Sequence, residues 1–139
     1  MRGVKSCRMK IMFVRQNFLG KVSHSVFLKI LQVSRVHVYL TFPFVLSWSM
    51  LEAMSAGCLV VGSRTAPVEE LIRDGENGLL VDFFSATGIS ERVVEVLAAG
   101  REGYADIRQA ARRTIVENYD LESICLPAQL QLLEKTRDR

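Results

Sequence analysis

Short apolar segments recur along the chain, and their spacing predicts alternating strands and helices. Residues 23–34 carry apolar side chains at helical spacing, which predicts an amphipathic helix facing a core. The segment 36–40, VHVYL, is β-branched and aromatic and too short for a helix, so it predicts a strand. The runs at 58–62 and 79–81 are uninterrupted apolar segments typical of strands covered on both faces, and 9–14 is apolar enough for a further strand.

Further helices are predicted between and after these strands. Ser49 and Glu52 have the spacing of a capping box, which predicts a helix with Ser49 as its N-cap and Glu52 at its third position. A shorter helix is predicted over 68–73, and two helical stripes follow it. Residues 121–135 predict a last helix that Pro127 must break, kink or restart. The count of four short strands and about six helices indicates an α/β fold, an open parallel sheet with a helical C-terminal tail.

Several polar side chains have a plain structural interpretation. His37 lies within the predicted strand 36–40, where a lone histidine is more often structural than a ligand or a base. Three arginines, Arg108, Arg112 and Arg113, lie largely off the apolar stripe of their predicted helix. A solvated face explains these arginines better than an anion site does.

Composition narrows the class of protein. With 139 residues, of which 49% are hydrophobic and 24% charged, the chain is long enough for one compact domain. A net charge of +3 supports neither nucleic-acid binding nor membrane association. No apolar run approaches the roughly 20 residues needed to span a bilayer, and residues 1–10 lack the features of a signal peptide, so we expect a cytoplasmic protein. The three cysteines fit neither a disulfide framework nor a zinc site; we expect them to be reduced, with Cys58 buried.

The candidate ligand site is the junction between strand 36–40 and the helix that follows it. Ligands of open parallel sheets bind beyond the carboxyl ends of the strands, and this loop brings Ser47 and Ser49 to a helix N-terminus. Backbone amides and the helix dipole there favour a phosphate, by on the order of a kcal/mol from the dipole. Glu52 and Glu70 could both face the same crevice, and for Glu52 helix capping and binding of ribose hydroxyls remain open. The chain has neither a Walker lysine motif nor a glycine-rich dinucleotide fingerprint.

The run over residues 49–82, SMLEAMSAGCLVVGSRTAPVEELIRDGENGLLVD, resembles the donor-binding half of retaining glycosyltransferases of family 4, which have the GT-B fold. The segments LEAM at 51–54, AGC at 56–58 and DGENGLLV at 74–81 fit the pattern of that family in order and spacing. The resemblance covers about residue 18 to the C-terminus and implies a Rossmann-like domain, half of a GT-B fold, that binds a nucleotide-sugar.

The resemblance also implies roles for individual residues. Glu52 falls on the second family glutamate and would hydrogen-bond the donor ribose, while Phe44 stands where the first family glutamate is expected. Glu70 matches a family glutamate whose role is mainly structural. Phe44 and Glu70 therefore rank as possible site residues, below the donor-binding residues that the resemblance implies. The implied donor-binding residues are Val45, Leu46, Ser47, Trp48, Ser49, Met50 and Glu52.

Other parts of the family pattern have no counterpart in this chain. The acceptor site and the catalytic histidine of the family lie in an N-terminal Rossmann-like domain, so no catalytic residue is expected here, and no metal or cofactor is implied. The basic clamp for the diphosphate also belongs to an upstream part, and Lys21 and Arg35 do not match it. We therefore expect a truncated enzyme domain that is inactive alone, or, as the alternative, a non-catalytic nucleotide-binding or remnant module.

These expectations divide the chain into three parts. Residues 1–8 are expected to be a disordered start, 9–118 the Rossmann-like nucleotide-sugar-binding domain, and 119–139 the helical tail. The expected partner is a nucleotide-sugar donor, with no nucleic acid, and the sequence does not indicate the acceptor.

Overall fold

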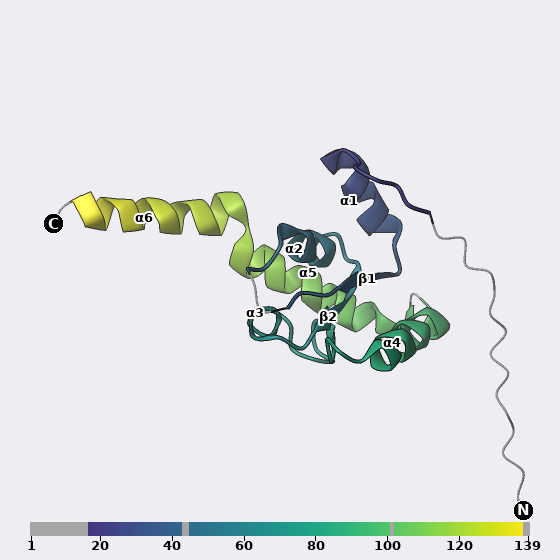
Figure 1. Ribbon diagram of the computed structural model, residues 1–139. Helices are drawn as coiled ribbons and strands as arrows, with labels where there is room; N and C mark the ends of the chain where they lie inside the picture. The colour runs from purple at the N-terminus through teal and green to yellow at the C-terminus, as the bar shows by residue number, and fades with distance from the viewer. Residues whose placement is uncertain (1–16, 43–44, 101, 138–139) are drawn as a thin grey trace, which may run out of the picture.

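The computed structural model describes residues 17–42, 45–100 and 102–137, and the chain alternates there between helices and parallel strands (Figure 1). The elements are α1 (His24–Val33), β1 (Val36–Tyr39), α2 (Trp48–Ser55), β2 (Leu59–Ser63), α3 (Ala66–Glu69), β3 (Leu79–Val81), α4 (Ala86–Ala99), the short 3-10 helix η1 (Glu102–Tyr104), α5 (Ala105–Tyr119), the π-helical turn η2 (Leu121–Cys125) and α6 (Leu126–Arg137). The predicted α/β class is confirmed. The strand predicted over 9–14 and the disordered start predicted over 1–8 lie outside the described residues.

The three strands form one parallel sheet in the order β1-β2-β3. Val36 is paired with Leu59, and Val61 with Leu79. Parallel neighbours require crossover connections, and here α2 and α3 supply them. The carboxyl ends of all three strands therefore lie at the same edge of the sheet, and the connection from β1 to α2 leaves from that edge.

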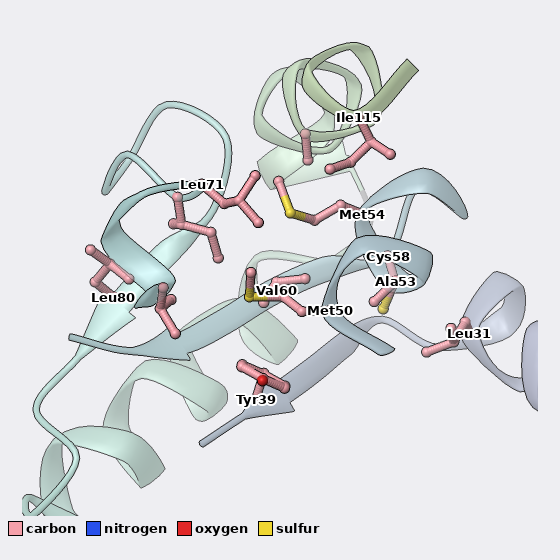
Figure 2. Packing of buried hydrophobic residues seen from close by; sticks show 13 residues of the cluster. Leu31, Tyr39, Met50, Ala53, Met54, Cys58, Val60, Leu71, Leu80 and Ile115 are labelled. Atoms are coloured by element: carbon pink, nitrogen blue, oxygen red, sulfur yellow. The ribbon is translucent and has the colours of Figure 1, made fainter. Parts of the chain in front are cut away.

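Helices cover both faces of the sheet, as expected from the uninterrupted apolar runs that form β2 and β3 (Figure 1). Val60 and Leu80 belong to the larger core cluster, which α1, α2, α3 and α5 complete. Figure 2 shows Met50 and Met54 of α2 packed between the strands and Ile115. The alternate strand positions, such as Val61, pack with Val96 of α4 on the other face.

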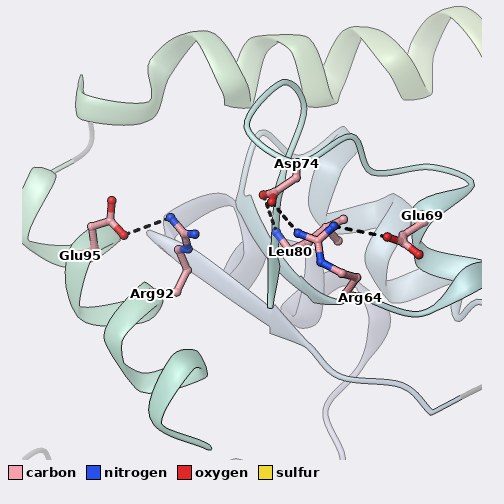
Figure 3. Close-up of polar contacts among 6 residues, drawn as sticks. All are labelled: Arg64, Glu69, Asp74, Leu80, Arg92 and Glu95. Carbon is pink, nitrogen blue, oxygen red and sulfur yellow. Dashed lines mark hydrogen bonds and ion pairs between the residues drawn. The ribbon is translucent and has the colours of Figure 1, made fainter. Parts of the chain in front are cut away.

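Polar contacts cover the outer side of β3. The carboxylate of Asp74 accepts a hydrogen bond from the backbone amide of Leu80 at 2.9 Å (Figure 3). Its other oxygen lies 2.7 Å from Nη2 of Arg64, and Nη1 of the same arginine lies 3.4 Å from Oε1 of Glu69. Arg64 thus ties the turn that precedes β3 to helix α3.

Two predicted helix starts are wrong by two residues. The N-cap of α2 is Ser47 rather than Ser49, because the Ser47 side chain accepts the hydrogen bond from the Ser49 amide. Helix α3 spans Ala66–Glu69 rather than 68–73, with Pro67 inside its first turn, where a missing N–H costs nothing. In the tail, Pro127 stands at the second position of α6, so the α-helix restarts after the π-helical turn, one residue before this proline.

The solvated-face interpretation is wrong for Arg108. This residue is 7% exposed and, with Ala111 and Ile115, forms the buried face of α5 at positions i, i+3 and i+7. Its Nη2 donates to the carbonyl of Arg35 at 2.7 Å, which gives the buried guanidinium a partner. Arg112 is exposed but donates to the carbonyl of Ser55. Cys58 is buried, as predicted.

Helix α6 extends away from the rest of the domain (Figure 1). Its leucines remain 45 to 66% exposed. Within the described part of the chain, no helix is both long and apolar enough to cross a membrane.

Candidate functional site

The start of α2 is held by hydrogen bonds within the protein. The amide of Ser47 donates to the hydroxyl of Tyr39 at 2.8 Å, which ties the connection back to the end of β1. The amide of Ser49 donates to Oγ of Ser47 at 3.3 Å, and that of Met50 to the carbonyl of Ser47 at 3.2 Å. Three of the amides in the predicted phosphate-binding segment therefore already have partners. A phosphate at this point would have to compete with these bonds or use other donors.

The side chains of this segment divide between surface and core. Val45 and Trp48 are 75% and 82% exposed, whereas Met50 is fully buried. Leu46 is half-buried and packs against the larger core cluster. Met50 could thus contact a ligand only through its backbone, because its side chain is buried. Phe44, which stands at the position of the first family glutamate, lies outside the described residues.

Glu52 does not cap its own helix. It is the fifth residue of α2, and its Oε1 lies 2.5 Å from Nε2 of His24, the first residue of α1. The Glu52 side chain is 26% exposed and that of His24 is 68% exposed. Of the two interpretations left open for this glutamate, capping is excluded and a contact between helices takes its place.

Glu52 lines a groove of about 650 Å³ between α1, α2, α5 and the start of the tail. Leu28, Leu51 and Ile115 contribute to its apolar wall, and Trp48 stands one helical turn before Glu52 at its border. The volume is within the range of about 300 to 1,000 Å³ typical of small-molecule sites. The groove therefore combines an apolar surface, an exposed indole and a carboxylate.

Glu70 lies elsewhere, so the expectation that both glutamates could face one crevice is wrong. Because α3 is a single turn, Glu70 stands at its C-terminal end and lines a separate cavity of about 430 Å³. Arg73, Arg113 and Glu117 line the same cavity, which lies between the turn before β3 and α5. Because acidic and basic side chains both line this cavity, it favours neither an anionic nor a cationic ligand.

Sequence reasoning missed an aromatic cluster at the carboxyl edge of the sheet. The ring of Phe42, which follows β1, lies 5.5 Å from that of Phe83 and 5.6 Å from that of Phe84, both of which follow β3. Phe42 and Phe84 are 57% and 77% exposed. A Phe-Phe pair that begins two positions after a buried strand is the signal that the sequence offers. His24 was missed as well, because its position at a helix start carries no pattern of its own.

His37 behaves as a structural residue. It is half-buried in β1, and its ring lies 6.4 Å from that of Tyr39. Burial lowers the pKa of His37 from its ordinary value of 6.5, so the neutral imidazole is favoured. Among the described residues, no three His, Cys, Asp or Glu side chains are grouped closely enough to hold a metal ion.

Comparison with known proteins places this arrangement in context. Among curated proteins, the chain is similar to the N-acetyl-alpha-D-glucosaminyl L-malate synthase of Bacillus anthracis, with 26% identity over 107 residues, 77% of this chain. It is also similar to the lipopolysaccharide core biosynthesis glycosyltransferase LpsE of Rhizobium meliloti, with 34% identity over 84 residues, 60% of this chain. The chain spans about a quarter of the length of these relatives, 27% and 24%.

Solved structures share the fold. Sucrose-phosphate synthase from Thermosynechococcus elongatus superposes with a TM-score of 0.75 at 20% identity, covering 88% of this chain and 31% of the other. HepE from Anabaena, solved in complex with UDP, gives a TM-score of 0.66 at 18% identity, covering 80% of this chain and 29% of the other. The family described as glycosyl transferases group 1 matches residues 13–114, which include every strand of the sheet and the whole segment from β1 to Glu52. The chain belongs to the glycosyl transferases group 1 family.

Proposed function

We propose that this chain is the donor-binding part of a retaining GT-B glycosyltransferase of family 4, which moves a sugar from a nucleotide-sugar to an acceptor. The family match, which spans the junction of β1 and α2 together with Glu52, is the observation that carries this proposal. The UDP bound to HepE, a protein of the same fold, supports a nucleotide as part of the ligand.

In this proposal Glu52 binds the ribose of the donor. A carboxylate accepts hydrogen bonds at both oxygens, and in the described part of the chain only Oε1 has a partner. Oε2 can therefore accept from a hydroxyl of the sugar. The groove beside it is large enough for a nucleoside, and Trp48 offers an exposed aromatic surface at its border.

The segment 45–50 would hold the diphosphate through its serine hydroxyls and through those backbone amides that make no hydrogen bond at the start of α2. Electrostatic stabilisation of a leaving diphosphate generally needs several preorganised donors or cations. Arg112 is the only basic side chain among the described residues that line the groove, and it already donates to the carbonyl of Ser55. The remaining positive charge would come from a part of the enzyme upstream of this segment.

Titration of the full chain with UDP, GDP and ADP tests donor binding. Amide chemical shifts of Ser47 to Glu52 should change with at least one nucleotide at millimolar concentration. Glu52→Gln should weaken this binding about tenfold or more, because a neutral amide accepts less strongly from a hydroxyl. The control Glu91→Gln changes an exposed carboxylate of α4, away from the groove, and should leave the affinity unchanged. Unchanged shifts over this segment with all three nucleotides would refute the proposal.

Sugar transfer should require a second domain. The purified chain alone is expected to show no turnover, whereas addition in trans of the N-terminal Rossmann-like domain of a related enzyme should restore measurable transfer. Turnover by the chain alone would contradict the assignment of catalysis to the other domain.

A further inference from the structure

The contact between His24 and Glu52 joins two helices at the border of the groove. Nε2 of His24 and Oε1 of Glu52 are 2.5 Å apart, although the residues are 28 positions apart in sequence. His24 is 68% exposed and does not belong to either core cluster, so packing does not explain its position. The contact instead orients the one carboxylate among the described residues of the groove.

The electrostatics of α1 favour the same arrangement. The first turn of α1 contains no acidic residue, and the side chain of its N-cap, Ser23, makes no capping hydrogen bond. The positive end of a helix dipole is stabilised by a nearby negative charge. Glu52 supplies that charge across the helix pair, so its carboxylate is attracted to a fixed place by both the imidazole and the helix start.

We propose that His24 is a positioning residue for Glu52, holding Oε1 so that Oε2 faces a ribose diol in the groove. This inference rests on the proposed function. A glutamate side chain that is free to rotate loses conformational entropy when it binds a ligand. The hydrogen bond to His24 orders the Glu52 side chain before the ligand binds, so less entropy is lost on binding. His24 need not touch the ligand to raise its affinity.

The two hydroxyls of a ribose provide a specific readout. UDP and 2′-deoxy-UDP differ only in one hydroxyl, so the ratio of their affinities measures how well the carboxylate is aligned with the diol. A purely structural role of His24 would alter the stability of the fold or affect both nucleotides equally. Loss of alignment would weaken UDP more than 2′-deoxy-UDP.

The experiment measures the Kd of both nucleotides for the full chain and for five variants. His24→Ala should weaken UDP binding about fivefold to tenfold and reduce the preference for UDP over 2′-deoxy-UDP. His24→Gln keeps an N–H donor at a similar reach and should restore most of both effects. Lys29→Ala, a matched change at another exposed position of α1 outside the groove, should alter neither. In a Glu52→Ala background, which removes the acceptor altogether, His24→Ala should have no further effect on UDP.

The outcomes separate this inference from the proposed function. Binding of UDP with an unchanged UDP preference in His24→Ala would overturn the role of His24 and leave donor binding intact. An additional loss of affinity on combining His24→Ala with Glu52→Ala would overturn it as well, because the histidine would then act independently of the side chain at position 52. Absence of nucleotide binding by the wild-type chain would overturn both. A thermal melt of each variant confirms that the protein measured is folded.

Discussion

Replacing Tyr39 by phenylalanine tests the hydrogen bond that holds the start of α2 to the sheet. The Tyr39 side chain is 8% exposed, and its hydroxyl accepts the Ser47 amide at 2.8 Å. Tyr39→Phe keeps the ring in the core and removes only the acceptor. The Ser47 amide then loses its partner at the point where the connection from β1 enters the helix.

The expected loss of stability follows from the surroundings of this bond. An unsatisfied buried donor costs about 1 to 3 kcal/mol. Because Ser47 is itself exposed, water can replace part of the bond, so we expect about 1 to 2 kcal/mol. For a chain of 139 residues this corresponds to a fall in Tm of about 3 to 8 °C.

Urea denaturation and amide hydrogen exchange measure this effect together. The midpoint should fall without a change in the m-value, and exchange of the Ser47 amide should accelerate. Tyr119→Phe is the matched control, since Tyr119 is 42% exposed and its hydroxyl has no partner in the described part of the chain. Equal stability of Tyr39→Phe and Tyr119→Phe, with unchanged protection of the Ser47 amide, would refute the reasoning.

Two further predictions concern packing and pH. Gly62→Ala would place a Cβ 2.9 Å from Cγ1 of Val68 and 3.4 Å from Cδ1 of Ile72, and should cost about 1 to 3 kcal/mol in urea denaturation. Val68→Ala in the same chain should relieve part of the clash, so the double variant should lose less than the sum of the single losses; additive losses would argue against the clash. Burial lowers the pKa of His37, so between that lowered value and 6.5 the unfolded chain binds a proton that the folded chain excludes, and the free energy of unfolding should fall as pH decreases through this window. His37→Leu should flatten this dependence measured by denaturation at several pH values; an equal slope in wild type and His37→Leu would contradict the assignment.

The strands were predictable because β2 and β3 are short, fully buried apolar runs and β1 is a short β-branched and aromatic segment. The predicted ranges 36–40, 58–62 and 79–81 differ from the observed strands by at most one residue at either end. The start of α2 was not predictable in the same way. Ser47 and Ser49 both suit an N-cap, and the hydroxyl of Tyr39, eight positions before Ser47, contributes to the choice between them.

The sequence named candidate site residues, but it could not specify how they are arranged. Sequence pattern singled out Glu52, yet its contact with His24 depends on how α1 and α2 pack, which local spacing does not specify. Arg108 shows the same limit. A buried guanidinium needs a partner, and that partner, the carbonyl of Arg35, lies 73 positions away in sequence.

The contact of Asp74 with the Leu80 amide has a consequence for how the sheet can grow. An open edge strand exposes amides that recruit strands from other chains, which is a route to aggregation. Here the carboxylate occupies the outward amide of β3, and Arg64 holds that carboxylate in place. Strand addition at β3 would first have to displace this ion pair, so extension of the sheet, whether by a neighbouring segment or by another molecule, is directed to the side of β1.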